Sequence, residues 1–224
     1  MAQPLDLQEQ EQLDALKSFW KSYGSLITWA LVAALAVYAG INGWRYWQRD
    51  QAAKAAAMFG QLEQAAQAGD AQRSGQIFDD LKERYARTAY AEQAGLLAAR
   101  VQFDRGQADA AKASLAWVAD HAGEDEYRSV ARLRLAALLL QAGDFDGALK
   151  QLDAAKSPPF AALVADRRGD VLLAQGKPAE ARAAYQAAWQ AMDEKVEYRQ
   201  LIDAKLTALG AAPATAAKAS EAAK

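Results

Sequence analysis

Few side chains in this 224-residue sequence are of the types that build catalytic or metal sites. The chain has one histidine, His121, and no cysteine. A single imidazole excludes any site that needs two, and the missing thiols exclude disulfides, cysteine nucleophiles, Cys-ligated zinc and iron–sulfur clusters. His121 stands in Asp120-His121-Ala122-Gly123. A cation just before a glycine is typical of a helix C-terminus, which favours a structural role over a ligand role.

Charged clusters are the remaining candidates for chemistry. Glu124-Asp125-Glu126 could hold a divalent cation, but acidic residues in the first turn of a helix are ordinary partners of its dipole. Arg132-Leu133-Arg134 and Arg167-Arg168 could bind phosphate, although a helix turns one arginine of each pair away from the other. No phosphate-binding loop, nucleophile elbow or zinc-protease motif is present. We therefore expect no catalytic residues, no cofactor and no metal, and a non-enzymatic role.

The composition favours a helical protein that works by contact. Lys and Arg number 26 against 28 Asp and Glu, a net charge of −2, which gives no electrostatic reason to expect nucleic acid as a partner. Alanine, the best helix former, is the commonest residue, and there are only 5 prolines. The predicted fold class is all-α.

An uncharged stretch near the N-terminus predicts a transmembrane helix. No Lys, Arg, Asp or Glu occurs at residues 22–44, which would form a helix roughly 34 Å long, enough for a hydrocarbon core of about 30 Å. Phe19, Trp20 and Tyr23 stand at one edge and Trp44 and Trp47 at the other, as interfacial aromatics do.

Two alternatives to an anchor are less consistent with the sequence. A core helix of a soluble domain would leave the aromatic residues at both edges unexplained. A cleaved signal peptide could end near Ala34-Leu35-Ala36. However, the segment before the apolar stretch is long and acidic, whereas that of a signal peptide is short and basic. The orientation stays open on charge alone, because Lys17 and Lys21 before the segment nearly balance the basic residues after it.

Three stretches after the anchor align around a glycine. They are Gly106-Gln107-Ala108-Asp109-Ala110-Ala111, Gly143-Asp144-Phe145-Asp146-Gly147-Ala148 and Gly176-Lys177-Pro178-Ala179-Glu180-Ala181, and Gly69-Asp70 begins a degenerate fourth copy. Seven residues before each of the three glycines stands a small residue, and nine residues after it a bulky one. This pattern resembles the tetratricopeptide repeat, whose period is roughly 34 residues. We expect each glycine to end one helix in a left-handed cap, and the small residues to let paired helices approach closely.

The pattern divides the chain as follows. We expect helices at residues 12–70, 71–86, 89–104, 107–121, 125–141, 145–155, 160–175, 178–193 and 195–209, with a break at Ser157-Pro158-Pro159. The predicted domains are an acidic tail at 1–21, the transmembrane helix at 22–44, a tetratricopeptide-like solenoid at 45–210 and a disordered Ala-rich tail at 211–224.

A solenoid of helix pairs offers a groove lined by the first helix of each pair. The predicted partner-binding positions in this groove are Leu96, Arg100, Phe103, Leu133, Ala137, Leu140, Asp166, Asp170 and Leu173. Such a mixture of apolar and charged side chains suits an extended peptide or a helix. The alternative is that Leu133 and Leu140 simply pack between repeats.

The architecture and the edges of the anchor resemble the YfgM family, the ancillary subunit of the bacterial Sec translocon. The matching motifs are F-W-K-x-Y-G at residues 19–24 and G-W-R-Y-W-Q at residues 43–48. The resemblance implies a single-pass protein of the bacterial inner membrane, with its N-terminus in the cytoplasm and its solenoid in the periplasm. It also implies three kinds of partner: Sec translocon subunits, a membrane-anchored periplasmic chaperone of the prolyl-isomerase class, and newly translocated polypeptides.

The resulting hypothesis is a non-catalytic adaptor or chaperone that passes newly translocated proteins to periplasmic chaperones. The alternative is a scaffold for cell-envelope assembly machinery that binds its partners through the same groove.

Overall fold

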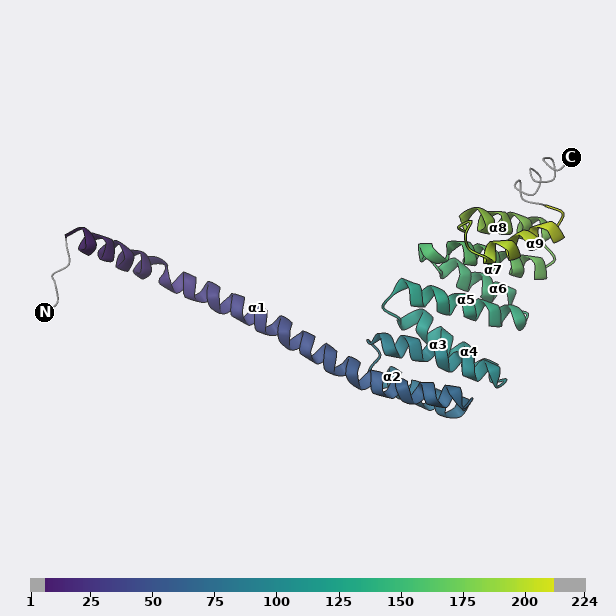
Figure 1. Ribbon diagram of the computed structural model, residues 1–224, viewed down its shortest axis with the longest axis horizontal. Helices are drawn as coiled ribbons and strands as arrows, with labels where there is room; N and C mark the ends of the chain where they lie inside the picture. The colour runs from purple at the N-terminus through teal and green to yellow at the C-terminus, as the bar shows by residue number, and fades with distance from the viewer. Residues whose placement is uncertain (1–6, 212–224) are drawn as a thin grey trace. The chain divides into compact units, whose positions relative to one another are not determined.

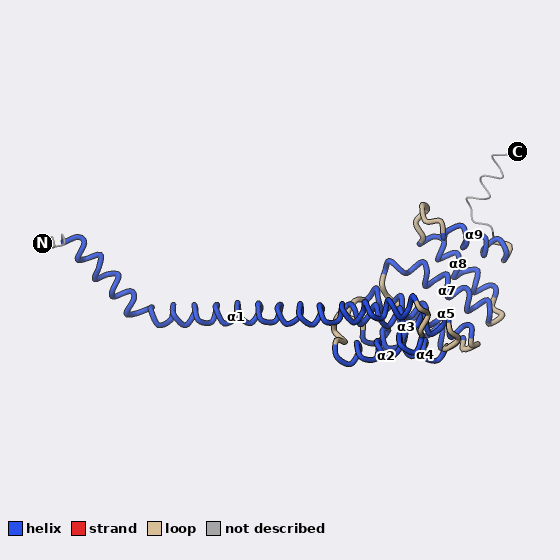
Figure 2. The backbone as a smooth tube through the Cα atoms, turned by 60° about the horizontal axis from the view of Figure 1, so that its bottom comes forward, coloured by secondary structure: helices blue, strands red, loops and turns tan. Residues whose placement is uncertain are grey.

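The computed structural model describes residues 7–211, and the side chains from residue 11 onward. The chain divides into two compact units, Met1–Gln51 and Ala52–Lys224. Throughout the described range the backbone is helix and loop, with no strand (Figure 2). The elements are α1 (Leu7–Gln67), α2 (Ala71–Arg84), α3 (Ala89–Asp104), α4 (Ala108–His121), α5 (Asp125–Gln141), α6 (Phe145–Ala154), a short 3₁₀ helix η1 (Pro158–Phe160), α7 (Ala161–Ala174), α8 (Pro178–Ala191) and α9 (Tyr198–Ala208). The predicted all-α class is confirmed.

The helix ends differ from the prediction mainly at the two extremes of the described chain. Helix α1 begins at Leu7 rather than residue 12 and ends at Gln67, three residues before the predicted end, because the cap at Gly69 stops it. Helix α9 begins three residues later than predicted. The reason is a turn in which Asp193 Oδ1 accepts a hydrogen bond from the backbone N–H of Lys195 at 2.9 Å. The predicted disordered tail lies outside the described residues apart from Ala211.

The first unit carries the apolar stretch on α1. Only 6% of its most apolar window is buried, and α1 is the single helix described in this unit, so large side chains such as Trp29 and Tyr38 are exposed. Aromatic rings pair near both ends of the stretch: Phe19 with Tyr23 at 5.1 Å, and Trp44 with Trp47 at 5.0 Å between ring centroids. A bilayer would cover such an exposed apolar helix, with the aromatic residues at its two interfaces.

In the second unit, the first helix of each pair ends at a left-handed glycine, as predicted. The glycines with positive φ are Gly69, Gly106, Gly143, Gly176 and Gly210. At Gly106 the glycine N–H donates to Phe103 O at 2.9 Å and the Gln107 N–H donates to Gln102 O at 2.8 Å. This is the Schellman arrangement, and it satisfies carbonyls that the helix end would leave free. A side chain at this φ would be strained, so each cap demands glycine.

Antiparallel helix pairs stack along the second unit (Figure 1). Helix α3 packs on α4, α5 on α6, and α7 on α8, while α4–α5 and α6–α7 contacts join one pair to the next. The first helices also contact one another, α3 with α5 and α5 with α7, and so form one continuous row. Residues 52–67 of α1 share a core with α2 and α3 through Ala55, Leu62 and Ala65.

Each pair brings a small residue of its first helix against a bulky residue of its second. Ala99 and Leu115 share one core cluster, and Ala136 and Leu152 share another. In the last pair the small residue is Gly169, and a Cβ built on it would lie 2.8 Å from Cζ of Tyr185 and closer still to the near edge of that ring. The larger ring of Tyr185 therefore fits because its neighbour has no side chain at all.

Successive pairs are joined by a repeated polar contact across 31 residues. In the first turn of α3, Glu92 Oε1 accepts a hydrogen bond from the Gly123 N–H at 2.8 Å, in the loop before α5. In α5, Glu126 Oε1 stands 3.5 Å from the Ser157 hydroxyl, in the loop before η1. The Ser157 N–H donates to Ser129 Oγ at 3.2 Å. These contacts hold the loop that enters each following helix pair.

We expect Gly169→Ala to lower the free energy of unfolding by about 1–3 kcal/mol, because the new methyl group must displace the buried Tyr185 ring. The matched control is Gly60→Ala in α1, where a Cβ meets nothing within 4 Å. There, helix propensity alone should make the change neutral or stabilising by about 0.5–1 kcal/mol. Urea unfolding followed by circular dichroism measures both.

The clash also predicts coupling between the two positions. The double variant Gly169→Ala with Tyr185→Leu should lose less free energy than the sum of the two single changes, since leucine leaves room for the methyl group. Strictly additive losses would contradict the proposed contact.

Candidate functional site

A pocket of 360 Å³ lies on the row of first helices, between α3 and α5. We call it the α3–α5 pocket; its lining residues are Ala99, Arg100, Phe103, Leu115, Arg134, Ala137 and Leu138. Arg100, Phe103 and Ala137 belong to the groove predicted from the sequence. Apolar side chains form the walls, and two guanidinium groups stand at the pocket.

The two arginines of the α3–α5 pocket have few compensating partners. Arg100 Nε lies 3.8 Å from Asp104 Oδ2, a pair in which both side chains are well exposed and which therefore stabilises little. Arg134 Nη1 donates to Leu96 O at 3.4 Å, a long contact. Burial is the main cause that lowers the pKa of Arg134, and the positive charge of Arg100 lowers it further. The pocket thus concentrates positive charge beside an apolar wall.

Large apolar residues occupy the same register near the ends of the first helices. Phe103 and Leu173 are 39% and 42% exposed, each three residues before a capping glycine. Leu140 holds the same position in α5 but is partly buried against the α5–α7 core. Leu133 packs against that core too, and Leu96 against the core of α3 to α5. These three leucines fill space between helices, while Phe103 and Leu173 present open apolar surface.

The structure corrects the placement of Asp166, which was predicted to face the groove. Asp166 is 1% exposed. Lys205 Nζ, from α9, donates to both of its carboxylate oxygens at 2.8 and 2.9 Å, and Tyr198 Oη donates to Oδ2 at 2.8 Å. The physical reason is that α9 covers this face of α7, so the carboxylate is not open to a partner.

Asp170 belongs to the same network. Its Oδ1 accepts hydrogen bonds from Lys205 Nζ at 2.7 Å and from Tyr185 Oη at 2.8 Å, and Arg167 Nη1 lies 3.4 Å from its Oδ2. Both aspartates therefore hold the last helix in place. Burial and the hydrogen bond to Asp166 raise the pKa of Tyr198 to about 12, and burial and the bond to Asp170 raise the pKa of Tyr185.

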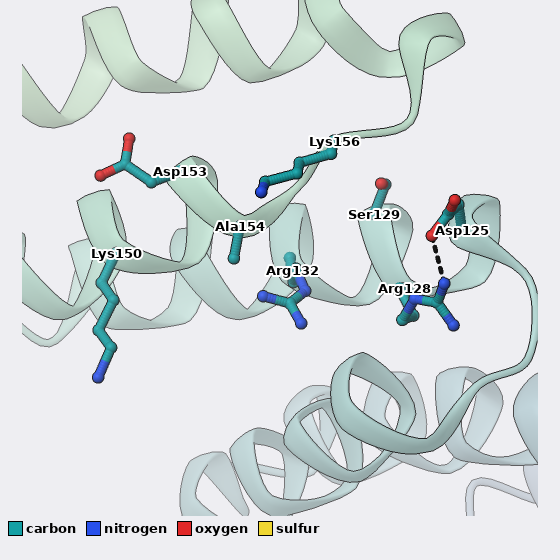
Figure 3. A pocket seen from close by; sticks show the side chains of 8 residues that line it. All are labelled: Asp125, Arg128, Ser129, Arg132, Lys150, Asp153, Ala154 and Lys156. Atoms are coloured by element: carbon teal, nitrogen blue, oxygen red, sulfur yellow. Dashed lines mark hydrogen bonds and ion pairs between the residues drawn. The ribbon is translucent and has the colours of Figure 1, made fainter.

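A second pocket, of 480 Å³, lies between α5 and α6 and is strongly polar (Figure 3). Its arginines and aspartates already serve the fold. Arg128 pairs with Asp125 and donates to Ala122 O, and Arg132 Nη2 donates to Ala119 O at 3.0 Å, so both arginines bind the end of α4. Arg132 and Arg134 thus belong to different pockets, as their helix spacing predicts.

No group of three or more His, Asp or Glu side chains that could hold a metal ion occurs within residues 11–211, where side chains are described. His121 stacks on Trp117, with ring planes 8° apart, and its Nδ1 donates to Trp117 O at 2.9 Å at the end of α4. This is the structural role that the sequence favours.

Several residues of the site were not predicted. Arg134 was considered only as half of a phosphate-binding pair, and Leu115 and Leu138 were not considered as pocket residues. The position one repeat after Arg100 is Ala137, because the capping glycines Gly106 and Gly143 lie 37 residues apart. Arg134 stands one turn before Ala137 on the same helix, and this near coincidence is the signal that could have joined the two arginines. Lys205 and Tyr198 had no such signal, because α9 stands outside the repeat.

The stacked helix pairs and their glycine caps define a tetratricopeptide-like solenoid protein, and α1 carries a candidate membrane-spanning stretch. The comparisons with known proteins agree with this class: the family model described as "Tetratricopeptide repeat-like domain" matches residues 17–211. Beyond this class, the chain belongs to the YfgM family, whose curated members carry the name ancillary SecYEG translocon subunit.

Three relatives illustrate the similarity. The ancillary SecYEG translocon subunit of Neisseria gonorrhoeae is 32% identical over 205 residues, which cover 91% of this chain and 98% of the relative. The protein of the same name from Haemophilus influenzae is 30% identical, covering 82% and 90% of the two chains. That from Escherichia coli is 29% identical, covering 80% and 86%.

The Tyr198 phenol predicts how the fold responds to alkaline pH. Because its pKa is raised in the folded state to about 12, the protonated phenol favours folding fully below the ordinary pKa near 10. This contribution is lost as pH rises from about 10 to about 12. We expect the difference in free energy of unfolding between the native chain and Tyr198→Phe to be constant below pH 10 and to shrink above it, as measured by urea unfolding. A difference that persists unchanged to pH 12 would contradict the assignment.

Proposed function

We propose that the chain is a non-catalytic, membrane-anchored adaptor of the Sec translocon that passes newly translocated proteins to periplasmic chaperones. The name of its relatives supports the association with SecYEG. The observation on which the proposal depends is the α3–α5 pocket with exposed Phe103 beside it, an open binding surface on the row of first helices. His121 and Arg132 bind the end of α4, and Asp166 and Asp170 bind α9.

The binding surface suits a polypeptide in extended or helical form. Apolar walls and flanking charges let the surface accept side chains of several kinds. Leu173 extends the apolar surface to α7, while Phe103 and Ala137 supply it at α3 and α5. The proposed partners are the Sec translocon subunits, a membrane-anchored periplasmic chaperone of the prolyl-isomerase class, and the newly translocated chains themselves.

The proposed location is the bacterial inner membrane. In this arrangement residues 1–21 lie in the cytoplasm, residues 22–44 cross the bilayer and the solenoid at 45–210 lies in the periplasm. The exposed apolar stretch of α1, with its paired aromatic rings at both ends, supports the anchor. The orientation comes from the family resemblance, and it can be tested directly because the chain has no cysteine.

Single cysteines placed at Gln12 and Gln186, both exposed, test the orientation. We expect a membrane-impermeant maleimide to label Gln186→Cys in intact spheroplasts and to label Gln12→Cys only after the membrane is opened with detergent. The reverse pattern would place the solenoid in the cytoplasm and contradict the proposed function.

Photocrosslinking tests the binding surface. A photoreactive amino acid at Phe103 or Ala137 should crosslink to Sec subunits, to a periplasmic chaperone or to a chain in transit. The control position is Ala113, which is exposed on α4, a second helix. We expect at least several-fold more of these products from the first two positions than from the control.

Crosslinks confined to cell-wall or outer-membrane assembly proteins would instead support a scaffold role. Equal products from all three positions would show that the row of first helices is not the binding surface.

A further inference from the structure

We propose that the α3–α5 pocket binds an extended peptide segment in which an acidic side chain adjoins an apolar one. The carboxylate would lie between the guanidinium groups of Arg100 and Arg134, and the apolar side chain would pack against Phe103 and Leu138. This inference rests on the proposed function and names the chemistry that the same site selects.

The first argument is electrostatic. Arg100 and Arg134 come from neighbouring helices of the same row, and the charge of Arg100 contributes to the lowered pKa of Arg134. Within the described part of the chain no carboxylate lies at ion-pair distance from Arg134, and Arg100 has only the exposed Asp104 at 3.8 Å. A carboxylate bound between two like charges would remove their repulsion and gain charge-assisted hydrogen bonds.

The second argument is the apolar wall. Phe103 is 39% exposed, and Leu115, Leu138, Ala99 and Ala137 complete a lining without further charge. A volume of 360 Å³ is near the lower end of ligand pockets and admits a few side chains rather than a folded domain. An anion without an apolar neighbour would therefore leave most of the pocket unfilled.

The polar pocket between α5 and α6 differs from the α3–α5 pocket in how its arginines are paired. There, Asp125 pairs with Arg128 and Asp153 pairs with Arg168, so carboxylates of the chain itself meet arginines in and beside that pocket. In the α3–α5 pocket the positive charge is left for an outside partner. Since acidic and basic residues are balanced over the whole chain, 28 against 26, the positive charge is local and favours a short acidic segment over an anionic membrane surface.

The experiment compares two peptides on the full-length protein in nanodiscs of phosphatidylcholine. One fluorescein-labelled, C-terminally amidated peptide carries Phe-Asp-Leu-Asp at its centre, and the other carries Phe-Asn-Leu-Asn. Fluorescence anisotropy gives both affinities at low and at high salt. We expect the acidic peptide to bind about tenfold more tightly at low salt, and high salt to reduce that preference.

Three variants and one control locate the effect. Arg134→Gln and Arg100→Gln should each remove most of the preference for the acidic peptide, whereas Phe103→Ala should weaken both peptides alike. Arg87→Gln removes an exposed arginine in the loop before α3 and should leave both affinities unchanged. Circular dichroism of each variant shows that it is folded.

Equal affinity for the two peptides, or a preference that survives in Arg134→Gln and Arg100→Gln, would overturn the proposal. Arginine-dependent binding to vesicles of phosphatidylglycerol that exceeds binding to the acidic peptide would also overturn it, in favour of a lipid surface. If Phe103 crosslinks to Sec or chaperone partners while the peptides bind equally, the adaptor function stands and only the ligand chemistry is wrong. An absence of crosslinks together with equal peptide binding would contradict both the proposed function and the proposed ligand chemistry.

Discussion

The close approach of two helices within each pair is the constraint on which the rest of the solenoid depends. At the crossing, the first helix offers a methyl group or nothing, as at Ala99, Ala136 and Gly169, and the second helix fills the space with a larger side chain. Close-packed interiors tolerate neither a void nor an extra methyl group at such points. The abundance of alanine is therefore a packing requirement as much as a preference for helix. The first helices of neighbouring pairs also contact one another and form a continuous row.

That row explains why the α3–α5 pocket lies where it does. The left-handed glycine caps end α3, α5 and α7 at equivalent positions, so residues one turn before each cap recur at the same register. Phe103 and Leu173 are exposed there, and Arg100 and Arg134, which stand one turn out of register on neighbouring first helices, line the same pocket. Repetition of the backbone thus brings together side chains that are far apart in the sequence. The repeat spacing of the caps decides where the pocket lies. The chemistry of the pocket depends on which of its residues differ from their equivalents in the other repeats.

Much of the fold could be predicted because it follows from local signals. Glycine caps, the proline pair before α7 and the small-to-bulky spacing are all readable one repeat at a time, and α3 and α5 begin and end as expected. The residues of the groove were harder to predict, because the exposure of a side chain depends on contacts between helices that are distant in the sequence. Asp166 has the right helix position to face a partner, yet α9 brings Lys205 onto it from 39 residues away. The sequence predicts the helix at 195–209, but nothing in the repeat pattern shows that it packs on this face of α7.

The pairing of Gly169 with Tyr185 has a consequence for how such a chain can change over time. Leucine occupies the corresponding position in the two preceding pairs, and alanine stands opposite it. The helices of the α7–α8 pair are consequently not exchangeable with those of the two preceding pairs: α7 placed opposite leucine would leave a void, and α3 placed opposite Tyr185 would collide with it. A duplication of this part of the chain would therefore have to copy α7 and α8 together, because either helix alone would face a neighbour of the wrong size.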